Sequence, residues 1–314
     1  MVPLAVKKQT VAILAILTVS SLAVLISSNP SYAQTSIPSW IKNNAKMWSE
    51  GQITDSEFVQ GIKYLIENKI MVIEQNKMQD KGDFKVEYIP VTDSNYTQYE
   101  EMIKDSGLYE QYADGLNKMF VLPTDVTITW KECGVPNAFY DHDSKHLIMC
   151  YELVKYFRDT FYNESQSDQE LVNKTLGATT FTFIHELGHG LIDVYNLPAT
   201  GKEEDAVDQL STIVLLYAGP NGKQAIESAA SWFYISGSKA NLEEMPFWDE
   251  HSFDTQRFYE IACLTYGKDP QENSFMVDQQ ILPESRAVKC PAEYEKINRA
   301  WTTLLEPYIK EEYR

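Results

Sequence analysis

Two histidines four positions apart, with a glutamate directly after the first, form the part of this sequence best suited to chemistry. The segment reads His185-Glu186-Leu187-Gly188-His189. Residues four apart on an α-helix share a face, so the two histidines can hold one zinc ion through neutral imidazoles. Glu186 can then reach a metal-bound water and act as a general base. The spacing predicts a catalytic zinc site, and two buried histidines without a metal are the structural alternative.

Two glycines lie within the same apolar run of residues 181–192. Gly188 and Gly190 each cost a helix about 1 kcal/mol relative to alanine. Glycine is favoured where another backbone or a metal site approaches closely. The pair therefore favours a tightly packed functional helix over an ordinary one.

A second helix is predicted shortly after the first. Residues 196–201 break the helical pattern, and Thr200 with Glu203 forms a capping-box pattern that opens the next helix. On that helix Glu204 and Asp208 lie four positions apart on one face. This Glu-x-x-x-Asp spacing resembles that of gluzincin-type zinc peptidases. The resemblance implies that Glu204 is the third zinc ligand and that Asp208 orients a ligand histidine.

Two neighbouring acidic residues are weaker candidates for the third zinc ligand. Glu203 is expected to cap the helix, and Asp205 points about 100° around the helix from Glu204. An acidic helix N-terminus without a ligand is the structural alternative, because the helix dipole favours it. The metzincin class is excluded, since it requires Gly three and His six residues after the second histidine, where this chain has Ile192 and Tyr195.

The elements that must position these residues are mainly strands at first and helices after them along the chain. A helix is predicted over residues 96–119, and the signal after Tyr151 is helical almost to the C-terminus. Strands followed by helices indicate an α+β fold. The predicted strands cover residues 84–89, 126–130, 138–140 and 146–150, and the predicted breaks in the helical part fall at 196–201, 219–222 and around Pro246.

The composition limits the class of protein. A chain of 314 residues with 44% hydrophobic residues can form one large or two modest domains and is not wholly disordered. Its 14 Gly and 13 Pro exclude a collagen-like chain. The 45 acidic residues exceed the 27 basic ones, for a net charge of −18, which argues against general nucleic-acid binding.

Residues 1–33 have the pattern of an export signal. Lys7 and Lys8 precede an apolar stretch over residues 11–26, and Ser31 to Ala33 resembles a cleavage site. A membrane span usually needs about 20 apolar residues, so a cleaved signal is favoured over an uncleaved anchor. Either alternative predicts a secreted or otherwise extracytoplasmic protein.

Four cysteines in an exported chain suggest two disulfides. Sequence alone permits three pairings, and the local ones, Cys133–Cys150 and Cys263–Cys290, are favoured. Each would stabilise the fold by roughly 3 kcal/mol if unstrained. A cysteine-ligated metal is disfavoured because the chain contains no C-x-x-C pair.

Residues 34–76 are predicted to form a separate helical hairpin. Trp40 and Trp48 recur at helical spacing, and Thr54 with Glu57 forms a capping box before a second helix. The hairpin is expected to bury these tryptophans, and residues 76–83 to form a polar linker. Residues 38–71 also resemble a small module of secreted archaeal proteins, which suggests a spacer or a contact with the cell envelope.

From about Asp83 to the C-terminus the chain resembles a family of exported bacterial and archaeal proteins described as "putative metallopeptidases". The resemblance implies a zincin-like domain over residues 83–314, one catalytic zinc ion and both local disulfides. It implies no particular substrate. The matching motifs are Glu132-Cys133-Gly134 and residues 136–140, 148–152, 185–189, 201–209, 256–259 and 290–294.

The same resemblance suggests how a peptide would bind. In zincins an edge strand above the catalytic helix accepts an extended peptide by strand addition. Ala138, Phe139 and Tyr140 are predicted to form this strand. An ordinary hairpin strand clamped by Cys133 and Cys150 is the alternative.

Zinc peptidases also need a donor for the developing oxyanion. The candidates are His251, Tyr259 and Arg257, with His251 ranked first. A surface or packing role for His251 is the alternative. His142 and His146 lie in the predicted hairpin and are expected to be structural or exposed.

The leading hypothesis is a secreted zinc-dependent endopeptidase acting on peptides or proteins. His185, His189 and Glu204 would hold Zn²⁺ and leave one position for water, with Glu186 as the base. A second hypothesis is a zinc-stabilised, non-catalytic binding protein of the cell envelope. A third is a membrane-anchored envelope factor whose function resides in residues 34–76. No nucleic-acid partner is expected.

Overall fold

The computed structural model describes residues 39–68, 78–240 and 247–314. The chain divides into two compact units, one containing Met78–Arg314 and the other containing the first two helices. The predicted export signal and Pro246 lie outside the described residues. None of the helices in the described ranges is long and apolar enough to cross a bilayer.

The smaller unit contains α1 (Ser39–Ser49) and α2 (Asp55–Glu67). The capping box of Thr54 and Glu57 at the start of α2 is confirmed. The predicted burial of the tryptophans is wrong, because Trp40 is 46% and Trp48 42% exposed. Two short helices have too little surface to enclose indole rings. Trp48 instead stacks on Phe58 at the hairpin surface.

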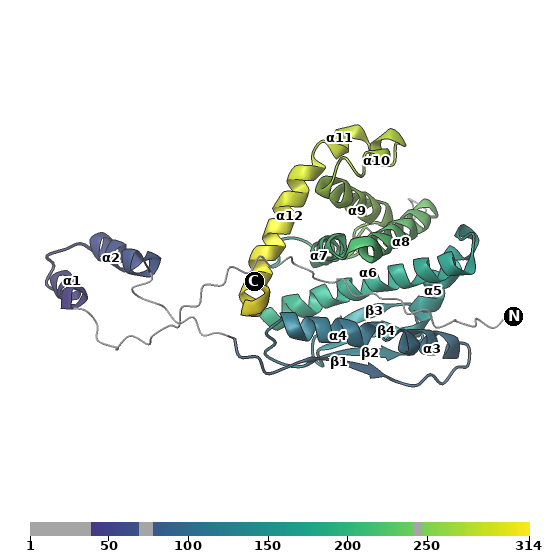
Figure 1. Ribbon diagram of the computed structural model, residues 1–314, viewed down its shortest axis with the longest axis horizontal. Helices are drawn as coiled ribbons and strands as arrows, with labels where there is room; N and C mark the ends of the chain where they lie inside the picture. Colours follow the sequence, from purple (N-terminus) through teal and green to yellow (C-terminus); the bar gives the residue numbers. More distant parts are fainter. Residues whose placement is uncertain (1–38, 69–77, 241–246) are drawn as a thin grey trace. The chain divides into compact units, whose positions relative to one another are not determined.

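A four-stranded sheet forms one layer of the larger unit (Figure 1). The strand order is β1-β2-β4-β3, with β1, β2 and β4 parallel and β3 antiparallel to β4. All four predicted strands are present, with boundaries within one residue of those expected. They are β1 (Phe84–Tyr88), β2 (Val126–Lys131), β3 (Ala138–Asp141) and β4 (His146–Cys150).

Helices make up most of the remainder, which confirms the α+β class. The helix expected over residues 96–119 is in fact two, because Gly107 adopts a left-handed φ of 58° and ends the first. The break expected at 219–222 is also misplaced, since α8 begins at Gly219 with Pro220 in its first turn. The helices are α3 (Thr97–Ser106), α4 (Leu108–Met119), α5 (Tyr151–Phe161), α6 (Asp168–Tyr195), α7 (Glu203–Tyr217), α8 (Gly219–Ser238), α9 (Asp254–Lys268), α10 (Phe275–Asp278), α11 (Glu284–Ala287) and α12 (Cys290–Leu305).

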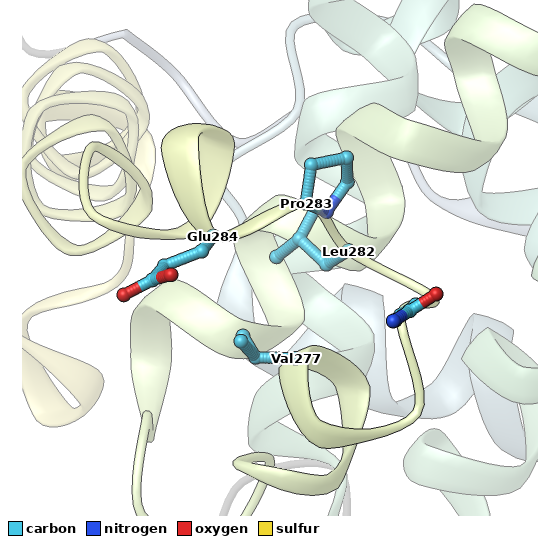
Figure 2. A pocket seen from close by; sticks show the side chains of 5 residues that line it. Val277, Leu282, Pro283 and Glu284 are labelled. Atoms are coloured by element: carbon cyan, nitrogen blue, oxygen red, sulfur yellow. The ribbon is translucent and has the colours of Figure 1, made fainter.

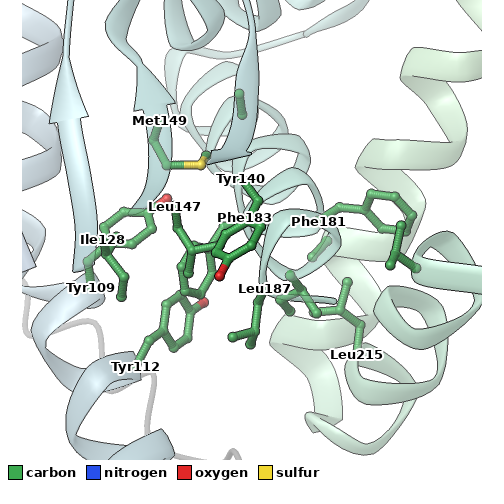
Figure 3. Close-up of a cluster of buried hydrophobic side chains, with 14 of the residues drawn as sticks. Tyr109, Tyr112, Ile128, Tyr140, Leu147, Met149, Phe181, Phe183, Leu187 and Leu215 are labelled. Carbon is green, nitrogen blue, oxygen red and sulfur yellow. The ribbon is translucent and has the colours of Figure 1, made fainter. Parts of the chain in front are cut away.

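Helix α6 is the centre of the core. It packs against β3 and β4 on one side and against α7 and α8 on the other (Figure 1). Phe183 points toward the sheet layer and stacks on Tyr112, whereas Phe181 points toward α8 and contacts Phe233 (Figure 3). A helix that is apolar on several faces is buried on all of them. The histidine motif therefore lies on the most enclosed element of the fold.

Of Gly188 and Gly190 in α6, Gly188 lies where another element approaches closely. A Cβ atom on Gly188 would lie 2.7 Å from Val207 Cγ1 of α7. A Cβ atom on Gly190 would lie 3.4 Å from the Tyr140 ring of β3. Gly188 thus allows the close contact between α6 and α7, whereas a Cβ atom on Gly190 would make an ordinary van der Waals contact with β3.

The segment before β1 is not a linker in its described part. Residues 76 and 77 lie outside the described ranges, but Gly82 pairs with Leu122 as an isolated bridge. Asp80 forms an ion pair with Lys310 near the C-terminus. A Cβ atom on Gly82 would lie 1.9 Å from the Thr124 carbonyl carbon, so the chain runs directly against the domain here.

Both local disulfides are confirmed. Cys133 is bonded to Cys150, where β4 ends and α5 begins. Cys263 of α9 is bonded to Cys290 at the start of α12. The first bridge ties the segment before β3 to its partner strand, and the second joins two C-terminal helices.

An open pocket of about 500 Å³ lies in the region of α10 and α11 (Figure 2). It shares no residue with the histidine motif or with its surroundings described below. Its lining consists of Val277, Gln280, Leu282, Pro283 and Glu284.

The close contact between α6 and α7 can be tested with a methyl group. Gly188→Ala should lower the free energy of unfolding of the metal-free protein by about 1–3 kcal/mol, because the added carbon overlaps the branched Val207 side chain. Gly115→Ala is the matched control, since a Cβ there meets nothing within 4 Å. It should stabilise α4 by about 0.5–1 kcal/mol. Equal effects of the two substitutions in urea denaturation would contradict the close packing.

Candidate metal centre

Three imidazoles converge on one carboxylate. Glu204, at the second position of α7, has its Oε2 atom 3.0 Å from His185 Nε2 and 3.0 Å from His251 Nε2. Its other oxygen, Oε1, lies 3.4 Å from His189 Nε2. The side chain of Glu204 is only 14% exposed. Helices α6 and α7 and the segment before α9 therefore meet at this point.

Each of these imidazoles has a second carboxylate at its other ring nitrogen. His185 Nδ1 lies 2.8 Å from Asp208 Oδ1, and His189 Nδ1 lies 2.7 Å from Glu203 Oε1. His251 Nδ1 lies 3.0 Å from Asp249 Oδ1. A carboxylate at Nδ1 holds a proton on that nitrogen, so Nε2 is the atom that a neutral ring would offer to a metal ion. All three rings are thus oriented with Nε2 toward Glu204.

A buried arginine holds the carboxylate behind His185. Arg257 of α9 donates from Nε to Asp208 Oδ2 at 2.6 Å and from Nη2 to Oδ1 at 2.8 Å. Its guanidinium carbon lies 4.1 Å from the centre of the Phe233 ring. Burial acts to raise the pKa of Asp208, but the charge of Arg257 and the bond to His185 bring it down to about 2. Asp208 therefore stays ionised and fixed in orientation.

Two contacts hold the segment that carries His251 against the start of α7. Lys202 Nζ donates to the backbone oxygens of Asp249 and His251, at 3.3 and 3.4 Å. Ser252 Oγ donates to Asp205 Oδ1 at 2.6 Å. The segment is thereby anchored beside the residues that flank Glu204.

Glu186 lies in the same enclosed region. It is 6% exposed, and burial raises the pKa of its carboxyl group. The charges of His185, His189 and Glu204 also act on it, so it lies among them. Within the described ranges no hydrogen bond fixes its carboxylate. A buried carboxyl group with a raised pKa and no partner is suited to accept and release a proton.

The imidazoles and carboxylates of the cluster shift one another's pKa values. Burial alone would raise the pKa of Glu204, but bonds from three imidazoles hold it well below its usual range. Burial acts to lower the pKa of His189, but its bonds to Glu204 and Glu203 raise that pKa to about 9. The negative charge of the Glu204 carboxylate thus attracts positive charge strongly.

The donor set fits a zinc ion. Imidazole nitrogen and carboxylate oxygen are ordinary zinc ligands, at about 2.0–2.2 Å from the metal. Two such ligands in a tetrahedral site lie about 3.3–3.4 Å apart. The separations of 3.0 to 3.4 Å from Glu204 to the three Nε2 atoms are close to that value. The donor atoms of His185, Glu204 and His251 all lie within 4.8 Å of one another, whereas His189 is not part of that group and would have to move toward it for one ion to contact all four residues.

The structure brings together most of the predicted site residues. His185, His189, Glu204 and Asp208 lie in direct contact, and Glu186 is beside them. His142 is 63% exposed, and His146 Nδ1 lies 2.9 Å from Thr129 Oγ1 on the sheet, so both lie away from the cluster.

Other expectations are corrected. The capping box at Thr200 and Glu203 is wrong, because the N-cap of α7 is Lys202 and makes no side-chain bond. Glu203 instead contacts His189. Arg257 is not free for an oxyanion, because Asp208 occupies its guanidinium. Tyr259 is 37% exposed and makes its ring contact with Phe258, with no contact to the cluster among the described residues.

Sequence reasoning missed two carboxylates and one lysine. Glu203 was excluded by a plausible cap, although it directly precedes the predicted ligand. Asp249 lies two residues before His251, a spacing that allows its carboxylate to accept from both the backbone and the ring of that histidine. No sequence signal marks Lys202, whose partners are backbone oxygens far along the chain.

Residues 88–305 match a family, DUF4344, described as "putative metallopeptidase". No curated protein matches the chain. No solved structure matches it either. The match runs from the last residue of β1 to the end of α12 and so includes the whole histidine cluster.

The support of Asp208 by Arg257 can be tested by its removal. Arg257→Ala should lower the free energy of unfolding of the metal-free protein by about 3–5 kcal/mol, because the buried Asp208 carboxylate loses both guanidinium hydrogen bonds and keeps only its contact with His185. Arg286→Ala is the control, since Arg286 pairs with the more exposed Glu260 and Glu293. Its loss should cost about 1 kcal/mol or less. Similar costs for the two variants in chemical denaturation would contradict the role of Arg257.

Proposed function

The chain belongs to the DUF4344 family, described as "putative metallopeptidase", and we propose that it is a zinc-dependent endopeptidase with its catalytic centre at His185, His189 and Glu204. The observation that supports this most directly is the convergence of both histidine Nε2 atoms on Glu204. These residues come from two helices that pack closely at Gly188. The fold proposed for the larger unit is zincin-like.

His185, His189 and Glu204 would hold the ion. When bound, zinc supplies a Lewis acid that polarises a peptide carbonyl and lowers the pKa of water. Asp208 and Glu203 hold the two imidazoles of α6 in the tautomer that leaves Nε2 free. Arg257 in turn keeps Asp208 ionised.

Glu186 is the proposed general base. It lies one residue after His185, on the enclosed face where the imidazoles meet Glu204. The raised pKa of Glu186, caused by burial, brings it closer to the neutral range in which a base exchanges protons efficiently. Glu186 would take a proton from the attacking water and return it to the leaving amine.

Strand β3 is the proposed binding site for the backbone of an extended substrate. It lies at the edge of the sheet and packs on α6. Cys150 N donates to Asn137 O, so the peptide groups of Asn137 and Phe139 face β4. Those of Ala138 and Tyr140 therefore face the open edge, where a peptide could add by strand pairing.

A hydrogen-bonded clamp holds this strand over the catalytic helix. Tyr140 Oη donates to Asp193 Oδ2 at 2.7 Å, and Lys145 Nζ donates to the same oxygen at 2.6 Å. Asp193 lies one turn beyond His189 on α6. The clamp therefore couples the position of the strand to that of the metal-binding helix.

Of the three candidates for an oxyanion donor, His251 is the one that contacts Glu204, at 3.0 Å. It is therefore the group best placed to donate to negative charge that develops beside Glu204. The two disulfides are consistent with an extracytoplasmic location. The export signal and any envelope role of residues 34–76 remain predictions.

A zinc-stabilised, non-catalytic binding protein is the second candidate. The observation in its favour is His251, since a fourth protein donor is typical of a structural zinc site. Cleavage of a peptide library that stops with a zinc chelator and returns with zinc would favour the enzyme. Capture of peptides without cleavage would favour the binding protein.

The base is tested by an isosteric substitution. Glu186→Gln should abolish chelator-sensitive cleavage of a peptide library, because the amide cannot accept the proton, while zinc content stays at one ion per chain. Glu101→Gln, on the exposed surface of α3, is the control and should cleave as the unaltered protein does. A Glu186→Gln protein that cleaves normally would exclude this residue as the base.

The substrate strand is tested by removing single N–H groups. Ala138→Pro removes a group that faces the open edge, and proline is tolerated at the first residue of an edge strand. It should raise KM about fivefold, the value of one lost hydrogen bond, with zinc content unchanged. Phe139→Pro removes a group that faces β4 and should destabilise the fold instead. An unchanged KM for Ala138→Pro would contradict strand addition.

A further inference from the structure

We propose that His251 is a fourth protein ligand of the zinc ion in the resting protein, so that the segment carrying it closes the metal centre until it is displaced. The inference rests on the proposed function, since it concerns the same ion. It assigns to His251 a role before catalysis. As an oxyanion donor, His251 would act only after leaving the ion.

The first argument is that the ring of His251 has the same arrangement of carboxylates around it as the rings of the two histidines of α6. Each of the three rings has a carboxylate at Nδ1 and directs Nε2 toward Glu204. A carboxylate at the distal nitrogen is the usual support of a metal-binding imidazole. The other two histidines, His142 and His146, lack this combination. The repeated construction therefore points to a shared ligand.

The second argument is distance. His251 Nε2 is 3.0 Å from Glu204 Oε2, the same separation as His185 Nε2 from that oxygen. The donor atoms of His185, Glu204 and His251 all lie within 4.8 Å of one another. An ion placed between Glu204 and His185 would thus lie within reach of His251.

The third argument is that the segment is anchored where a ligand requires it. Lys202 and Asp205 bind the segment on both sides of His251, and these two residues flank the pair Glu203 and Glu204. Residues 202–205 thus include the ligand Glu204 itself. They also hold the proposed ligand His251 in place through its backbone oxygen and through its neighbour Ser252. A histidine that merely covered the surface would need no such support.

His251 is also the ligand that could leave. Its side chain is 43% exposed, whereas those of His185 and His189 are 5% and 12% exposed. It lies on a short non-helical segment before α9, while the other two lie within the buried α6. Four protein ligands complete a tetrahedral site, and catalytic zinc sites keep one position open. Displacement of His251 would provide that position.

The experiment measures metal binding and needs no substrate. Metal-free protein is titrated with zinc against a chromophoric chelator, and cobalt is bound in a parallel sample to record its absorption spectrum. His251→Ala should weaken zinc binding about 10–100-fold and change the cobalt spectrum, because one nitrogen ligand is lost. Asp249→Ala should weaken binding about tenfold, as expected for the loss of an orienting carboxylate.

His142→Ala is the matched control, because His142 is exposed and lies outside the cluster. It should leave zinc affinity and the cobalt spectrum unchanged. Circular dichroism of each metal-free variant confirms that the fold is intact. An unchanged zinc affinity and cobalt spectrum for His251→Ala would overturn the proposal. The proposed function fails by a different result, the absence of cleavage by zinc-loaded protein both with and without His251.

Discussion

The proposed metal centre depends on one largely enclosed carboxylate, that of Glu204, held among three imidazoles. A carboxylate removed from water in this way is costly unless positive charge or hydrogen bonds surround it. The nearby Nε2 atoms supply that compensation, and a cation shared with them would add to it. Glu204 reaches this point because α7 packs directly on α6 at Gly188 and Val207. The packing of two helices therefore brings the donors together.

The charge balance of the proposed centre supports the binding of a divalent cation. Acidic side chains surround it at every level, from Glu186 and Glu204 inside to Asp208 and Asp249 behind the imidazoles. Arg257 neutralises one of them, and its guanidinium is committed to Asp208 by two hydrogen bonds. Among the protein groups alone, the imbalance raises the pKa values of the imidazoles. A metal ion would supply the same positive charge without protons.

The rest of the fold fixes the walls of the centre. On one side, the clamp of Tyr140 and Lys145 on Asp193 holds the edge strand against α6. On the other side, α9 carries Arg257 and is joined to α12 through Cys263 and Cys290. The segment with His251 enters α9 directly. Its position is therefore tied to a helix that a covalent bond restrains.

The sequence by itself determined the local features of this protein. The spacing of His185, Glu186 and His189 depends only on helix geometry, and the four strands follow from short apolar runs bounded by turn residues. The local disulfides were also predictable, because cysteines in an exported chain usually pair and local pairing was favoured. Errors arose where one residue decides a boundary, as at Gly107, whose left-handed conformation divides a continuous helical pattern.

Only the tertiary structure decided the partners of these residues. A capping box at Thr200 and Glu203 was locally reasonable, but the approach of α7 to α6 makes the ring of His189 a better partner for Glu203. The pairing of Arg257 with Asp208, 49 positions away in sequence, and the approach of His251 to Glu204 depend on how α9 docks. Local patterns specify which face of a helix a side chain occupies. They do not specify which distant element will cover that face, because that choice is made by packing across the whole core.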